Sequence, residues 1–111
     1  MASKQSSVLQ GTLNLLVLQA LSIRGSLHGY AIATLIFTAS QDHLKIEEGS
    51  LYPALHRMEQ DGWISAAWGT SELGRRARFY EITTAGQSQL DTEKQHWLAI
   101  TNAVNLVLQW A

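Results

Sequence analysis

The last quarter of the chain constrains the fold more than any other segment. Residues 84–110 read as one long helix, which Thr83 or Thr84 can cap at its N-terminus. At about 1.5 Å per residue this helix is about 40 Å long, and a single domain as small as this one is narrower than that. We therefore expect the helix either to project from the domain or to pair with another helix.

Apolar residues recur along this helix at heptad spacing. Trp97 and Val104 share one seam, while Ile100 and Val107 lie in its companion. The hydrophobic fraction of the whole chain, 46%, is more than a soluble monomer of this size needs, which indicates a subunit interface or an apolar ligand site. The predicted dimer interface joins this helix to an earlier one and comprises Leu9, Leu13, Leu16, Leu90, Trp97, Ile100, Val104 and Val107.

Length and composition exclude several classes of protein. A chain of 111 residues is long enough for one domain, and the absence of cysteine excludes disulfides, thiolate catalysis and cysteine-based metal sites. The longest apolar run in the first half is far short of the roughly 20 residues that cross a bilayer, and no signal-peptide cleavage site follows it, so we expect a soluble cytoplasmic protein. The four histidines stand apart and no catalytic motif is present, which predicts neither an enzyme nor a metal site.

The order of the predicted elements is typical of a winged helix. Helices are predicted over 8–23 and 29–40, a short extended piece follows at 44–46, and a third helix runs from 49–50 to 60 with Ser50 as its N-cap and Pro53 in its first turn. Gly62 ends that helix as a left-handed residue. Strands over 63–68 and 77–83 then form a hairpin with a basic tip.

The predicted fold class is therefore α+β and mainly α: a winged helix-turn-helix with a two-stranded β-wing and a long C-terminal dimerisation helix. We expect residues 1–83 to form the winged-helix domain and residues 84–111 the dimerisation helix, which makes one structural unit with the first helix.

The third helix and the hairpin carry the candidate contacts to DNA. A helix entering the major groove presents the residues of its N-terminal end to the base edges, and guanidinium groups on a wing suit a phosphate or the minor groove. Each residue also has a plainer interpretation: Tyr52 as a half-buried aromatic, His56 as surface, Arg57 paired with Asp61, and the arginines as guards of a strand edge. A net charge of −1 argues mildly against DNA. The joint placement on one frame favours DNA, through Ser50, Tyr52, Pro53, His56, Arg57, Arg75 and Arg76.

Two longer motifs resemble those of the PadR family, regulators of the phenolic-acid-decarboxylase-repressor type. The run EEGSLYPALHRME at 47–59 is similar to the family's recognition helix, and GRRARFYEITTAG at 74–86 to its wing, second strand and last helix start. The shorter runs HGYAI at 28–32 and GTL at 11–13 match its second and first helices. The resemblance covers about residues 11–108, and the single C-terminal helix matches the family's short branch.

The resemblance implies a homodimeric winged-helix regulator of transcription, usually a repressor, that requires no metal or organic cofactor. It assigns DNA contacts to Ser50, Tyr52, Pro53, Arg75 and Arg76, and adds Tyr30 and Lys45 as contacts to phosphate. In some members of the short branch a flat apolar effector inserts between the subunits beside a tryptophan of the last helix, and Trp97 stands at the corresponding place.

We thus predict a sequence-specific DNA-binding repressor that acts as a homodimer on a near-palindromic operator and is released by a small apolar or aromatic effector. Trp97 has the alternative interpretation of a residue that only packs the dimer interface. The alternative function is a winged-helix module for protein interaction or ligand sensing, without specific DNA binding. Neither the effector nor the operator follows from the sequence.

Overall fold

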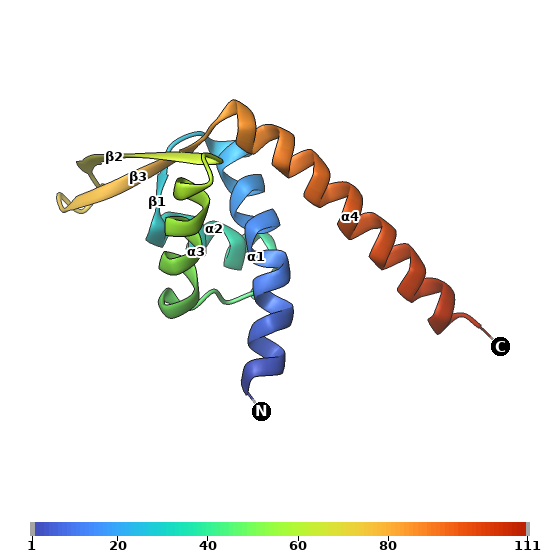
Figure 1. Ribbon diagram of the computed structural model, residues 1–111. Helices are drawn as coiled ribbons and strands as arrows, with labels where there is room; N and C mark the ends of the chain where they lie inside the picture. The colour runs from blue at the N-terminus through green and yellow to red at the C-terminus, as the bar shows by residue number, and fades with distance from the viewer. Residues whose placement is uncertain (1, 111) are drawn as a thin grey trace.

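Within residues 2–110, three helices and a small antiparallel sheet enclose the core, and a fourth helix runs away from them (Figure 1). The computed structural model describes the backbone of residues 2–110 and the side chains of residues 12–110. The elements are, in chain order, α1 (Ala2–Arg24), β1 (Leu27–His28), α2 (Gly29–Ala39), α3 (Glu48–Gln60), β2 (Ile64–Thr70), β3 (Arg76–Ile82) and α4 (Thr84–Leu108). This arrangement confirms the predicted winged helix-turn-helix fold with its long C-terminal helix.

The core lies between α1, α2, α3 and the inner half of the sheet. α1 is apolar on several faces and packs against α2, α3, β3 and α4, so it occupies the centre of the domain. Every buried side chain in the described part of the chain is apolar except for the phenol of Tyr80. The largest of the fully buried side chains are Leu13, Leu18, Leu21, Ile32, Leu51, Leu55, Met58, Ile64 and Leu90.

The sheet has the strand order β1-β3-β2, with both pairs antiparallel. β2 and β3 form the predicted hairpin, but both strands extend further toward its tip than predicted. β2 ends two residues later than predicted, and β3 begins one residue earlier. The predicted extended piece at 44–46 is wrong as a strand: the third strand is β1, where His28 pairs with Phe79. Residues 44–46 form a connection whose Ile46 is buried in the core, which explains the apolar pattern there.

α3 begins one to two residues before the predicted start. The carbonyl of Glu47 accepts hydrogen bonds from the backbone N–H groups of Ser50 and Leu51, so Glu47 is the N-cap and the prediction of Ser50 as cap is wrong. The carboxylate of Glu48 in the first turn favours this earlier start through the helix dipole. Pro53 consequently lies in the second turn instead of the first. The predicted end is confirmed, with Gly62 at φ 79° directly beyond it.

α4 follows β3 after a single residue and extends away from the rest of the molecule (Figure 1). Of the two predicted caps, Thr83 is the one that the structure uses, since its hydroxyl oxygen accepts from the backbone N–H of Gly86 at 3.0 Å. The described chain measures 56 × 30 × 24 Å, so the projecting helix sets its longest dimension. The division into residues 1–83 and 84–111 stays a prediction.

Candidate nucleic-acid interface

α3 turns one face to the core and leaves the other open. Leu51, Ala54, Leu55 and Met58 are buried, at the spacing of one helical face. The opposite face exposes the side chains of Tyr52, Pro53, His56 and Arg57, and Ser50 is half-buried at its start. The predicted contact residues of this helix therefore have a surface available. Lys45 is exposed in the connection that leads into α3.

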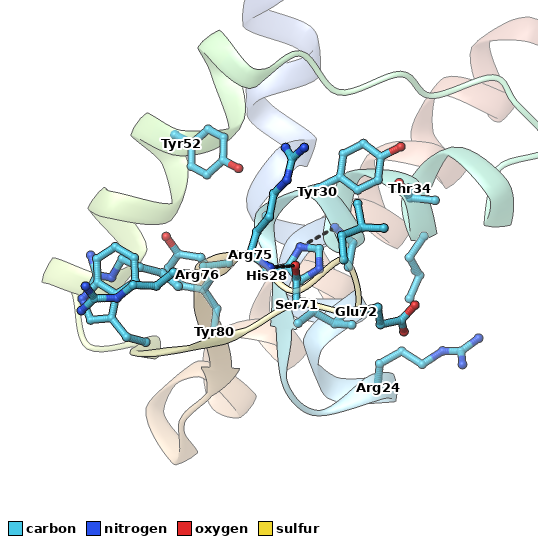
Figure 2. A pocket seen from close by; sticks show the side chains of 18 of the residues that line it. Arg24, His28, Tyr30, Thr34, Tyr52, Ser71, Glu72, Arg75, Arg76 and Tyr80 are labelled. Carbon is cyan, nitrogen blue, oxygen red and sulfur yellow. Dashed lines mark hydrogen bonds between the residues drawn. The ribbon is translucent and has the colours of Figure 1, made fainter.

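A groove of about 1260 Å³ opens between α2, the start of α3 and the wing hairpin. Figure 2 shows the side chain of Arg75 rising from the wing between the rings of Tyr30, from α2, and Tyr52, from α3. Arg76 lines the same groove beside the wing. Four predicted contact residues thus converge on one hollow. Ser50, Pro53, His56, Arg57 and Lys45 do not line it.

Tyr52 is held against the first residue of α2. A Cβ atom at Gly29 would lie 2.6 Å from the hydroxyl oxygen of Tyr52 and 2.8 Å from two of its ring carbons. Only a glycine admits the phenol at this distance. The side chain of Tyr52 is still 44% exposed, so the contact with Gly29 orients the ring without covering it.

α2 is itself fixed to the sheet at this end. The Nδ1 atom of His28 accepts a hydrogen bond from the backbone N–H of Ala31 at 3.2 Å and so caps the helix. The His28 ring meets Phe79 of β3 edge-on, with ring centres 5.3 Å apart. The groove wall that carries Tyr30 is therefore tied to β3, the strand that begins at Arg76.

The wing also carries an aromatic residue that the sequence reasoning missed. Trp68 of β2 is 60% exposed and lies under two guanidinium groups, those of Arg76 at 4.5 Å and Arg78 at 5.9 Å from its ring centre. Arg78 in turn forms an ion pair with Glu59 of α3, at 3.0 Å between Nη2 and Oε2. Trp68 and Arg78 are direct partners in register across the hairpin, and the predicted strand ranges did not specify this register. In the part of the chain described, Arg57 and Asp61 form no such pair.

Tyr80 forms part of the groove floor. It is buried beside the pair of Arg78 and Glu59, and burial raises the pKa of its phenol, while the positive charge of Arg78 acts in the opposite direction. The neutral phenol is therefore the form that the fold favours.

The predicted interface residues fall into two groups. Leu13 and Leu90 are 1% and 2% exposed in the single chain, because α1 and α4 pack against each other within it. These two belong to the core of the single chain and are almost fully buried within it, which corrects their assignment to the interface. Leu16 is partly buried against the same core. The outer residues Trp97, Ile100, Val104 and Val107 are all exposed. The side chain of Leu9 lies outside the described residues.

Two features are absent from the described residues. No cluster of three or more histidine, cysteine, aspartate or glutamate side chains that could hold a metal ion occurs among them. Over the same residues, each helix is too short or too polar to pass through a bilayer.

Comparison with known proteins gives consistent matches. The family model described as "Transcriptional regulator PadR-like family" matches residues 17–92. The crystal structure of the PadR-like transcriptional regulator BC4206 from Bacillus cereus superposes with a TM-score of 0.78 at 31% identity, covering 95% of this chain and 99% of that one. A transcriptional regulator from Clostridium thermocellum gives 0.80 at 28% identity, covering 89% and 95%. The Transcriptional regulator Rv3488 from Mycobacterium tuberculosis is 34% identical over 56 residues, about half of each chain.

Proposed function

The chain belongs to the PadR-like family of transcriptional regulators, and from that premise we propose that it is a homodimeric, sequence-specific repressor. Membership itself makes it a DNA-binding regulator of transcription and not an enzyme. The proposal adds the repressor role, the dimer, the residues that contact the operator and the release by an effector.

One observation carries the assignment of the DNA-binding face. The open face of α3 borders a groove into which Tyr30, Tyr52 and Arg75 converge from three different elements. Hydroxyl and guanidinium groups are the donors that phosphates attract, and a helix presented beside them can enter the major groove. We assign contacts with the DNA bases to the α3 residues Ser50, Tyr52, Pro53, His56 and Arg57. We assign contacts with the DNA phosphate backbone to Tyr30, Lys45, Arg75 and Arg76.

The outer part of α4 supports the proposed dimer. Ile100, Val104 and Val107 lie on the heptad positions and are exposed in the single chain, with Val107 at 71%. Apolar residues at this spacing are typical of a helix that pairs with another helix. A dimer with twofold symmetry would place its two recognition helices on half-sites about one helical turn apart, which requires a near-palindromic operator.

We further propose that a flat apolar or aromatic effector binds between the subunits beside Trp97. The indole is exposed on α4 of the lone chain, next to the proposed dimer seam. Such a ligand should quench tryptophan fluorescence, and Trp97→Ala should abolish the quenching while sedimentation still reports a dimer. An undiminished signal in Trp97→Ala would place the ligand elsewhere.

Selection from a randomised pool of duplexes tests the DNA-binding proposal and needs no assumption about the operator sequence. We expect the full chain to enrich a near-palindromic motif that binds two chains per duplex. Binding to the labelled motif, measured by fluorescence anisotropy, should persist when unlabelled random duplex is added at near-physiological salt. A pool that stays random after selection would instead favour a winged helix whose partner is a protein or a small ligand.

Matched variants separate the two kinds of contact. Arg75→Gln should weaken binding to the selected and random duplexes alike, because a phosphate contact carries no sequence information. Tyr52→Phe or Ser50→Ala should change the selected motif or the ratio of the two affinities. If both kinds of variant lower only the overall affinity, the assignment of base recognition to α3 is wrong.

A further inference from the structure

One face of the wing hairpin covers the core near α4, and the same face extends past the edge of the core toward the hairpin tip. Side chains alternate along a strand, so Ile64, Ala66 and Trp68 of β2 share one face, opposite Ile82, Tyr80 and Arg78 of β3. Ile64 and Tyr80 are buried, whereas Trp68 is exposed. Arg76, two residues from Arg78, lies further out on the same face. The outer half of this face is therefore aromatic and cationic instead of apolar.

Four side chains form a continuous series along this face, from α3 to the end of the hairpin. The Glu59 carboxylate binds Arg78 at 3.0 Å, Arg78 lies over Trp68, and Trp68 carries Arg76 at 4.5 Å. We call these residues, Glu59, Arg78, Trp68 and Arg76, the wing series. Its inner end is anchored to the recognition helix and its outer end is a guanidinium at the edge of the groove.

The two neighbouring arginines of the wing differ in this respect. The guanidinium of Arg76 lies within the distance at which an aromatic face attracts a cation. Among the described residues, the Arg75 side chain has no such partner, and only its backbone takes part in the turn with Ser71. A long side chain that is already ordered loses less conformational freedom when it binds a ligand. Arg76 is thus the pre-ordered cation, and Arg75 the free one.

We propose that Trp68 is a positioning residue that holds Arg76 in the orientation in which it binds the DNA backbone, with Arg78 and Glu59 fixing the hairpin to α3. This inference rests on the proposed DNA-binding function. Trp68 acts through Arg76 and requires no contact of its own with DNA. Its effect is therefore confined to the sequence-independent part of binding.

Double-mutant cycles on the full chain test the coupling. The probe is a labelled duplex of random sequence at about 50 mM salt, where backbone contacts dominate affinity. A cation–π contact at an exposed site corresponds to about a two- to fivefold change in Kd. We expect Trp68→Leu to weaken binding by that factor, and to have no effect in the Arg76→Gln background. In the Arg75→Gln background, which removes the same charge from the adjacent residue, Trp68→Leu should still cost the full factor.

A conservative variant of Trp68 separates the effect of its aromatic face from the effect of its side-chain size. Trp68→Phe keeps an aromatic face and should recover a large part of the affinity that Trp68→Leu loses. Arg76→Lys keeps the charge but not the planar group, and should lose affinity by a similar two- to fivefold factor. Trp68→Phe keeps an aromatic residue in the hairpin, so its coupling to Arg76→Gln tests the stack even if Trp68→Leu does not fold.

The outcomes are distinct. Equal losses from Trp68→Leu with and without Arg76, or no loss in either, would overturn the positioning role. A wild-type chain that binds no duplex at all would overturn the proposed function, and the inference with it. Binding that is intact and uncoupled would overturn only the inference.

Discussion

Replacing Gly29 with alanine should move the tyrosine of the recognition helix while leaving the fold in place. The new Cβ atom would lie 2.6 Å from the Tyr52 hydroxyl oxygen and 2.8 Å from Cε1 and Cζ. Non-bonded carbon atoms prefer about 3.5–4.0 Å, so the ring has to shift by about 1 Å. Because Tyr52 is partly exposed, it can swing toward solvent without displacing backbone.

The expected change in stability is small because two terms oppose each other. Alanine is favoured over glycine by about 1 kcal/mol in a helix interior and by less at the first residue of a helix, where Gly29 lies, and an off-rotamer tyrosine costs about 0.5–1.5 kcal/mol. The free energy of unfolding should therefore change by no more than about 1.5 kcal/mol. DNA affinity should fall about two- to tenfold, which corresponds to the loss of one hydrogen bond from a misplaced hydroxyl.

Thermal unfolding at one fixed protein concentration and DNA anisotropy measure the two effects separately. In the Tyr52→Ala background, Gly29→Ala should cost no further affinity and should raise the melting temperature. Gly49→Ala is the matched control for stability, since a Cβ there meets nothing within 4 Å and should stabilise α3. A loss of affinity from Gly29→Ala that persists without the Tyr52 ring would refute the reasoning.

Three further predictions concern the cap of α4, the groove floor and the exposed helix. Thr83→Ala removes a hydroxyl that accepts from the backbone N–H of Gly86 and donates to the carbonyl of Gly62. It should lower the free energy of unfolding, measured by urea melts, by about 0.5–2 kcal/mol. The control variant Thr84→Ala should be nearly neutral. Burial raises the pKa of Tyr80 above its usual 10.0, so the stability that this phenol contributes is present below pH 10.0 and is lost as the pH rises through the folded-state pKa. Tyr80→Phe should flatten this alkaline decline in stability. An unchanged decline in the variant would contradict the assignment. Val104→Glu puts a charge on the proposed α4 seam and should convert the dimer to monomer in light scattering, whereas Asn102→Glu, at an exposed position outside the predicted seam residues, should not.

Local patterns predicted the elements well where the signal lies in neighbouring residues. The end of α3 before Gly62 and the cap of α4 at Thr83 were readable from a few residues each. β1 was not, because a strand of two residues exists only through its pairing with Phe79, which is about fifty positions away. The apolar residues at 44–46 instead resembled a strand, since one of them is buried in the core.

The candidate site was predicted residue by residue but not as an arrangement. Tyr30, Tyr52 and Arg75 were each named, yet their meeting in one groove depends on the packing of α2, α3 and the hairpin. The wing series was missed because it requires the register that sets Trp68 against Arg78, and the predicted strands left Arg76 in the loop. Leu13 and Leu90 were misplaced because an apolar pattern on a helix does not distinguish a neighbour in the same chain from one in a partner.

The wing hairpin and α4 meet at the junction between β3 and α4 and together form a lever, with the hairpin as its short arm and α4 as its long arm. Only Thr83 separates β3, which carries Arg76 and Arg78, from a helix of 25 residues, and the Thr83 hydroxyl donates to the carbonyl of Gly62 just before β2. At 1.5 Å per residue the long arm measures about 37 Å, so a tilt of about 10° at the junction corresponds to about 6 Å at its far end. By the same geometry, a displacement of about 6 Å at the far end of the helix corresponds to a turn of about 10° at the junction, where the wing hairpin is attached.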